Sequence, residues 1–123
     1  MLFSSKQIKG HGRGHQVGFP TINLVEPTDL VLNEGIYAAW VVIDNKTYKG
    51  ALHYGTIPTF NQSSKTLEIY LLDVTDDNAP VTENTLIEVD IVEHLRDMKK
   101  FNSVENLAIQ IDLDVKKVRS ILK

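Results

Sequence analysis

The sequence predicts a mainly β protein: a small closed antiparallel β-barrel of about six strands in Greek-key order, with a C-terminal α-helix. Two observations favour this fold class. Between residues 3 and 92, short segments rich in β-branched, aromatic or alternating apolar residues recur without a helical pattern between them, which is typical of an antiparallel barrel rather than a parallel sheet. After Ser103 the apolar residues change to helical spacing.

The predicted strands comprise residues 3–8, 36–43, 47–54, 66–72 and 86–92, and the segment that bears Thr21 and Asn23 is also extended. Residues 36–43 are rich in β-branched and aromatic residues throughout, which predicts a strand buried on both faces. A turn at Asp44-Asn45 joins this strand to its partner, although lysine follows where hairpin turns favour glycine.

Residues 66–72 and 86–92 alternate between apolar and polar side chains. This period of two predicts strands with one face on the core and one in water. Glu68 and Tyr70 would then share one face of the earlier strand, and Glu88 and Asp90 would face outward on the later one.

The end of the chain predicts a helix packed on the outside of the barrel. Ser103 is a suitable N-cap. Behind it, apolar residues recur at helical spacing: Val104, Leu107, Ala108, Ile111, Val115, Val118, Ile121 and Leu122. Because Asp112-Leu113-Asp114 lies within this pattern, we expect either one long helix or two shorter helices broken near Asp112.

Length and composition are those of one ordinary globular domain, residues 1–123, with 42% hydrophobic residues and a net charge of −3. The acidic balance argues against a nucleic-acid partner, which normally needs an extended basic face. The absence of cysteine excludes disulfides and thiolate metal sites and fits a reducing compartment. No apolar run approaches the length of a membrane span. We therefore expect a cytoplasmic monomer.

The segment 10–24 stands out, because four glycines occur within nine of its residues. These are Gly10, Gly12, Gly14 and Gly18. Backbone N–H groups in such a loop can form a nest for an anion, and Arg13 adds a positive charge with bidentate geometry. Residues 1–25 contain three Lys or Arg, two His and no acidic residue. An ordinary tight turn remains the alternative, and the spacing matches neither the P-loop nor the dinucleotide fingerprint.

Thr21 and Asn23 follow Pro20, which stiffens the end of this loop. Two residues apart on an extended segment, their side chains point to the same face. A hydroxyl and an amide carbonyl are hard oxygen donors, which Mg²⁺ accepts alongside phosphates and water. The pattern therefore indicates a site for a metal-bound polyphosphate.

Gly-x-Gly-Arg-Gly followed by Gly-Phe-Pro-Thr-x-Asn resembles the signature of the riboflavin kinase family, and the resemblance extends over nearly the whole chain. It implies transfer of phosphate from ATP to riboflavin, giving FMN and ADP, with Mg²⁺ or another divalent metal. In many bacteria the similar kinase domain is fused behind an FMN adenylyltransferase domain. The residues expected to hold ATP and its phosphates are Gly10, Gly12, Arg13, Gly14, His15, Gly18, Pro20, Thr21 and Asn23, of which Thr21 and Asn23 would also contact the metal.

Phosphoryl transfer also needs a group that orients or deprotonates the hydroxyl. Glu68 is the candidate, because Glu-x-x-x-Leu-Asp after a second Pro-Thr loop resembles the segment that carries the family's catalytic glutamate. The resemblance implies a general base acting on the ribityl 5′-hydroxyl. From the pattern alone, Glu68 is simply a polar residue on the wet face of a strand.

The segment 95–103 resembles the family's connection between last strand and helix, where the resemblance implies a flap over the flavin. Arg96 and Phe101 are the expected flavin contacts, since a guanidinium and an aromatic ring can both border an isoalloxazine. The alternatives are a solvated surface charge for Arg96 and packing on the helix for Phe101.

Two departures from the family pattern limit what can be carried over. His53-Tyr54 stands where Asn-Ile often precedes the glycine of the loop 55–61, and residues 77–84 lack a Leu-Tyr-Gly turn. The loop 55–61 could also be an ordinary connection. The four histidines lack metal-ligand spacing. Two rival functions remain: a flavin-binding or nucleotide-binding module without turnover, and an oligonucleotide-binding barrel.

Overall fold

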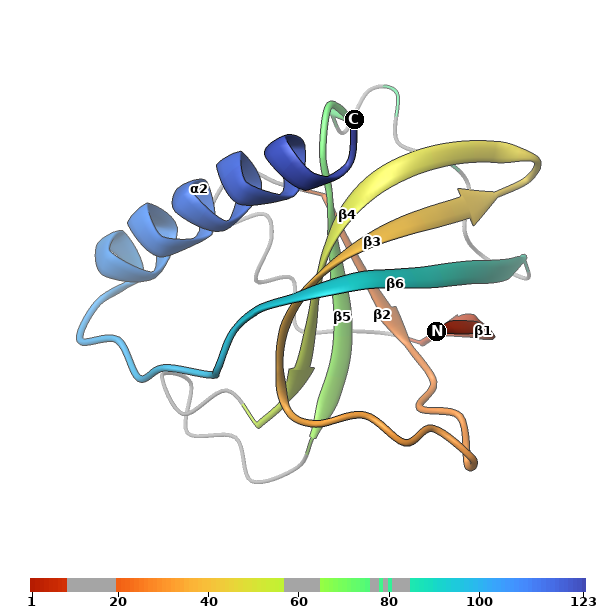
Figure 1. Ribbon diagram of the computed structural model, residues 1–123, viewed down its shortest axis with the longest axis horizontal. Helices are drawn as coiled ribbons and strands as arrows, with labels where there is room; N and C mark the ends of the chain where they lie inside the picture. Colours follow the sequence, from red (N-terminus) through yellow and green to blue (C-terminus); the bar gives the residue numbers. More distant parts are fainter. Residues whose placement is uncertain (9–19, 57–64, 76–77, 79, 81–84) are drawn as a thin grey trace.

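The computed structural model describes residues 1–8, 20–56, 65–75, 78, 80 and 85–123, and these ranges form a barrel with one helix across its outside (Figure 1). The elements are β1 (Leu2–Ile8), β2 (Thr21–Leu24), β3 (Gly35–Ile43), β4 (Lys46–Gly55), β5 (Thr66–Leu71), β6 (Leu86–Arg96) and α2 (Val104–Ile121).

The strands close into a barrel in the order β1-β2-β5-β4-β3-β6, and every neighbouring pair is antiparallel. Strands β3, β4 and β5 follow one another as neighbours, and β6 returns to lie beside β3, which is the Greek-key arrangement. The predicted fold class is confirmed.

The hairpin between β3 and β4 shows why its turn needs no glycine. Asp44 and Asn45 have φ angles of 51° and 67°, and Ile43 pairs directly with Lys46. A two-residue turn with both central φ angles positive matches the twist of the flanking strands, and Asp and Asn tolerate this conformation. The predicted turn is confirmed, and the lysine is already the first residue of β4.

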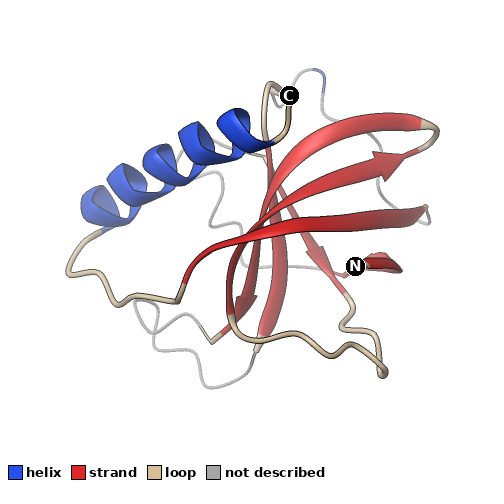
Figure 2. Cartoon of the chain, in the orientation of Figure 1, coloured by secondary structure: helices blue, strands red, loops and turns tan. Residues whose placement is uncertain are grey.

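Two apolar clusters occupy the two faces of the sheet. The interior cluster comprises Ile22, Leu24, Tyr37, Ala39, Val41, Ile43, Leu52, Tyr54, Leu67, Ile69, Leu71, Ile87 and Val89. The second cluster joins Ala38, Ala51, Tyr70 and Leu72 of the outer face to Leu107, Ile111, Val115, Val118 and Leu122 of the C-terminal helical region. Helix α2 lies against β3, β4 and β6 in this second layer (Figure 2).

Strand β5 is therefore buried on both faces, and the prediction of a half-buried strand is wrong there. Glu68 and Tyr70 are 0% and 1% exposed, and Tyr70 packs in the second cluster with residues of the helical region. In β6 the predicted alternation is confirmed, since Ile87 and Val89 are buried while Glu88 and Asp90 are exposed.

Helix α2 is a single unbroken helix, and Ser103 caps it as predicted by accepting a hydrogen bond from the backbone N–H of Asn106 at 3.1 Å. Asp112 lies inside this helix and does not break it. Its exposed side chain points into solvent, where it pairs with Lys116 one turn later at 3.2 Å. Strand β6 continues past Val92 to Arg96, so Arg96 ends a strand rather than lying in the connection. Among the described residues, no helix has both the length and the apolar character needed to cross a bilayer.

Candidate active site

Three polar residues that the sequence spreads over 46 positions lie side by side on the outer face of the barrel. Asn23 on β2 pairs directly with Glu68 on β5, and Glu68 pairs directly with His53 on β4. Directly opposite residues of antiparallel strands point to the same face, with Cβ atoms about 4.5–5.5 Å apart. Strand pairing therefore brings the predicted metal ligand Asn23 next to the predicted base Glu68.

The same row continues across the sheet. His53 pairs with Ile36 on β3, and Ile36 pairs with Arg96 on β6. With strands about 4.8 Å apart, the row from Asn23 to Arg96 spans about 19 Å along the curved sheet. The predicted metal and phosphate side thus lies at one end of the row and the predicted flavin contact at the other.

Strand β2 positions the two predicted metal ligands as the sequence suggested. Thr21 and Asn23 occupy alternate positions of the strand and so share its outer face. The carbonyl of Pro20 accepts a hydrogen bond from the backbone N–H of Leu71 at 3.0 Å, which ties the start of the strand to β5. Asn23 is 8% exposed, so its amide lies in a protected position beside the carboxylate.

The remaining predicted phosphate ligands lie outside the described residues, so their roles stay predictions. They are Gly10, Gly12, Arg13, Gly14, His15 and Gly18. The same holds for residues 57–61 of the second Gly/Pro loop and for most of the segment 77–84.

Glu68 is fully buried, with Oε1 shielded from solvent. A carboxylate removed from water is costly for the fold, and such a group is more often kept for chemistry than for stability. Its position on a strand between two other buried strands also holds the side chain in place. Glu68 is therefore not a polar residue on a solvated face, which was the alternative from the pattern.

A pocket opens farther along the row, between the barrel and the connection to α2. It is lined by Ile36, His53, Tyr70, Arg96, Met98, Lys99, Phe101 and Leu107. The rings of His53 and Tyr70 stack at 4.5 Å with an interplanar angle of 9°. The pocket leaves only about 10 Å³ for the centre of a water molecule, which is near the minimum that one water needs. From the connection, Met98, Lys99 and Phe101 line this narrow pocket, so their side chains would shift to admit a planar ring system.

The structure brings the two predicted flavin contacts, Arg96 and Phe101, together at this pocket. The guanidinium carbon of Arg96 lies 5.9 Å from the centre of the Phe101 ring, within the range of a cation–π contact. Phe101 also packs on the apolar layer under α2, so packing on the helix and lining the pocket are compatible roles. Arg96 is not a solvated surface charge, because its side chain is only 11% exposed.

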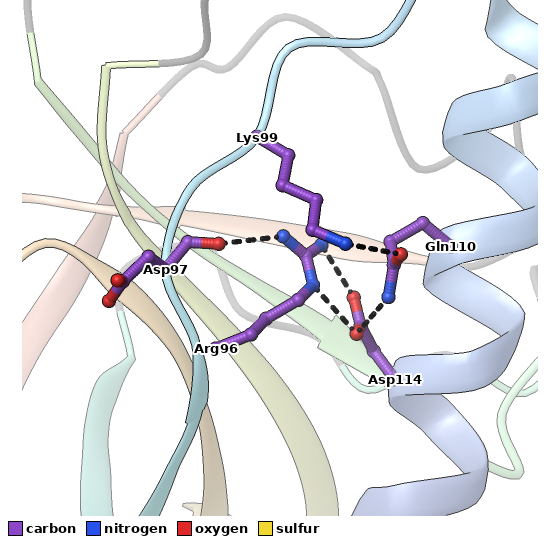
Figure 3. A network of polar contacts seen from close by, with 5 residues as sticks. All are labelled: Arg96, Asp97, Lys99, Gln110 and Asp114. Carbon is purple, nitrogen blue, oxygen red and sulfur yellow. Dashed lines mark hydrogen bonds and ion pairs between the residues drawn. The ribbon is translucent and has the colours of Figure 1, made fainter.

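Arg96 forms a two-pronged ion pair with Asp114 of α2 (Figure 3). Its Nε donates to Oδ1 of Asp114 at 2.9 Å and its Nη2 to Oδ2 at 2.8 Å. Gln110 donates to Oδ1 of the same carboxylate at 3.0 Å. Because Asp114 is 1% exposed, this pair is shielded from water, and bidentate Arg–carboxylate pairs are among the strongest hydrogen-bonded contacts in proteins.

Sequence reasoning missed Asp114 and gave His53 and Tyr70 no role in the site. One signal for Asp114 was present, because it lies on the buried stripe of the helix with Leu107, Ile111 and Val118. A carboxylate at a position where the helical period requires an apolar side chain needs a buried partner. The partner itself could not be named without the packing of α2.

Two tyrosines outside this row have raised pKa values. The Tyr54 hydroxyl donates to Oε1 of Glu26, and this hydrogen bond, together with burial and the charges of Glu26 and Glu34, raises the pKa of Tyr54 to about 12. Burial, and to a lesser extent the charge of Asp97, raises the pKa of Tyr37. Tyr54 packs in the barrel interior, so this pair bears on stability rather than on the site.

A family model described as riboflavin kinase matches residues 1–122 of the chain. The chain belongs to the riboflavin kinase family. Riboflavin kinases in general use ATP and a divalent metal.

Individual relatives of this family are longer than the chain. It is 34% identical over 110 residues to a trifunctional protein RibF/MnmA of Mycoplasmoides gallisepticum, covering 89% of the chain and 16% of that protein. It is 32% identical over 115 residues to an RNA-binding riboflavin kinase RibR of Bacillus subtilis, covering 93% and 48%. A bifunctional riboflavin kinase/FMN adenylyltransferase of Escherichia coli is 30% identical over 112 residues, covering 90% and 34%.

Solved structures share the fold. A riboflavin kinase from Trypanosoma brucei superposes with a TM-score of 0.69 at 21% identity, covering 98% of this chain and 78% of that one. A protein from Streptococcus pneumoniae described as a macrolide-efflux protein superposes with a TM-score of 0.80 at 26% identity, covering 96% and 38%.

Proposed function

We propose that this domain transfers the γ-phosphoryl group of ATP to the ribityl 5′-hydroxyl of riboflavin, giving FMN and ADP. The observation that carries the proposal is the row of paired residues across the outer face of the barrel. Asn23 and the buried Glu68 are direct neighbours, and the pocket bordered by Arg96 and Phe101 lies farther along the same face. An elongated substrate with a ring system at one end and a hydroxyl at the other fits such an arrangement.

Glu68 is the proposed general base. Its carboxylate accepts the proton of the 5′-hydroxyl while the hydroxyl oxygen forms a bond to the γ-phosphorus, and the bond from that phosphorus to the bridging oxygen of ADP breaks. Burial favours this role, because bulk water is kept away from the carboxylate and does not compete with the substrate hydroxyl for it. The backbone pairing of β5 on both sides keeps the carboxylate in one place.

Thr21 and Asn23 would hold the metal. Their hydroxyl and amide oxygens share one face of β2 next to the carboxylate, and this donor set suits a hard cation such as Mg²⁺ that keeps water and phosphate oxygens as its other ligands. When bound, the metal supplies positive charge that offsets the charge of the phosphates. Residues 9–19 precede β2 in the sequence, and their glycines and Arg13 are the proposed phosphate contacts.

The ring system of riboflavin would occupy the pocket beside the stacked pair of His53 and Tyr70. Phe101 provides an apolar wall and Arg96 a planar cation, and both kinds of group can stack against a flavin. Because the pocket has so little free space, binding requires the side chains of the connecting residues to shift outward.

The test is incubation of the purified chain with riboflavin, ATP and MgCl₂, followed by separation of flavins by chromatography. We expect FMN and ADP in equal amounts, and no FMN when ATP or the metal is omitted. Bound but unphosphorylated riboflavin would contradict the kinase and favour a flavin-binding module without turnover.

A further inference from the structure

Asp114 is a buried charge on the apolar side of a helix. It lies one turn from Ile111 and Val118 on the stripe that packs against the barrel, and it is 1% exposed. Burying a carboxylate is unfavourable unless a cation and hydrogen-bond donors meet it. Here both oxygens are used, one by Arg96 and Gln110 together and the other by Arg96 alone.

The contacts of Arg96 leave its guanidinium little freedom. Nε and Nη2 donate to Asp114, and Nη1 donates to the backbone carbonyl of Asp97 at 3.0 Å. Each of the three nitrogens therefore has an acceptor. Figure 3 shows the residues of this network meeting from three elements: Arg96 at the end of β6, Asp97 in the connection, and Asp114 on α2. The guanidinium carbon lies 5.9 Å from the centre of the Phe101 ring, and both residues line the pocket.

The connection between β6 and α2 is held at its two ends and less tightly between them. At one end Arg96 is joined to Asp114, and at the other Ser103 caps the helix. Between these ends, the Asp97 side chain is 90% exposed, and Lys99 meets Gln110 only at 3.5 Å. Residues 97–100 can therefore move to admit a ligand, while Phe101 packs under α2 and Arg96, the last residue of β6, stays attached to α2.

We propose that Asp114 is a positioning residue for riboflavin binding, holding the guanidinium of Arg96 at the wall of the pocket while residues 97–100 move. This inference rests on the proposed function for the identity of the ligand. Asp114 does not line the pocket and acts only through Arg96. It therefore affects how tightly riboflavin is held and leaves the transfer step at Glu68, three strands away, unaltered.

The test compares Asp114→Asn, Arg96→Gln and the double variant, with riboflavin binding measured by fluorescence and with kcat and KM measured for each substrate. For Asp114→Asn we expect riboflavin Kd and KM to rise about tenfold, as for the loss of one oriented charged hydrogen bond, with kcat and the KM for ATP little changed. In the Arg96→Gln background, Asp114→Asn should add nothing, because the two residues form one unit.

Independent, additive losses from the two substitutions would overturn the proposal, as would an unchanged riboflavin Kd in Asp114→Asn. The binding measurement separates this inference from the proposed function, because it needs no turnover. If the parental chain bound riboflavin but formed no FMN, the proposed function would fail while the role of Asp114 in binding would still be decided.

Arg119→Gln is the matched control. Arg119 lies on the same helix and pairs with Asp73 at 2.6 Å, but both side chains are largely exposed, at 45% and 59%. Its loss should leave riboflavin KM and kcat unchanged. If Asp114→Asn does not fold, as judged by its thermal melt, Gln110→Leu provides a milder variant that removes one donor to Asp114. It should raise riboflavin KM only about two- to threefold, because Arg96 keeps both of its hydrogen bonds to Asp114, and an unchanged KM would contradict the proposal.

Discussion

The interior of the barrel and its outer face both contain buried residues, but the two are built differently. The interior holds an almost wholly apolar cluster, whereas the buried part of the outer face combines apolar residues packed against α2 with the polar residues Asn23, His53 and Glu68. Both of these sets of residues are shielded from water, so burial alone does not distinguish them. The difference teaches that the interior serves the stability of the barrel, while the outer face accepts the cost of buried polar groups, which is the pattern expected where chemistry takes place.

Ile69→Ala probes the interior face and should give the largest effect. Ile69 is fully buried in the interior cluster, and truncating such a side chain costs about 2–5 kcal/mol because a cavity remains. Urea unfolding measures the loss. The folded fraction should keep the parental riboflavin KM, and a tenfold change in KM without loss of stability would contradict the division between the two faces.

Glu68→Gln probes the outer face of the same strand. Loss of a positioned base should lower kcat about 10²-fold or more, while stability is kept or increased because a buried charge is removed. The measurements are FMN formation and a thermal melt on the same preparation. If the variant turned over at the parental rate, Glu68 would not be the base.

Asn23→Ala probes the neighbouring position on β2. Loss of one neutral ligand should raise the MgCl₂ concentration needed for half-maximal activity about tenfold or more, with little change in riboflavin binding. Titration of FMN formation with MgCl₂ measures the effect. An unchanged metal dependence would remove Asn23 from the metal site.

Tyr54→Phe tests a polar pair on the interior side, where the effect should be smallest and confined to stability. The pKa of Tyr54 is raised from 10 to about 12, so its protonated form is favoured in the folded chain. The stabilisation is fully present below pH 10 and is lost as the pH rises toward 12. Thermal melts between pH 8 and 12 should show a steeper decline for the parental chain than for the variant. If the parental chain and the variant declined in parallel, the raised pKa of Tyr54 would not contribute to the stability of the fold.

Local patterns predicted much of the fold. Alternation placed the strands, the Asp44-Asn45 turn set the β3–β4 register, and Ser103 started the helix where expected. These patterns gave a wrong prediction for β5, which was expected to have one face in water and is buried on both. The period of Glu68 and Tyr70 assigned them correctly to one face, but a period of two cannot tell whether that face meets water or another layer.

The sequence predicted some residues of the candidate site and missed others, depending on whether they belong to a short motif or to a contact between distant segments. Thr21, Asn23 and Glu68 belong to motifs contiguous in sequence, so the resemblance could find them. Asp114 could not be paired with Arg96 in advance, because the contact depends on how α2 lies on the barrel and the residues are 18 positions apart on different elements. The described structure places His53 beside Glu68 only through the pairing of β4 with β5.

By itself, the sequence determined the barrel, the capped helix and membership of the family, because these follow from periodicity, turn chemistry and short motifs within single segments. Only the tertiary structure decided that Glu68 is buried, that Asn23, Glu68 and His53 form one row, and that Asp114 holds Arg96. The physical reason is that burial and ion pairing are properties of two surfaces in contact, and one segment of sequence specifies only its own surface.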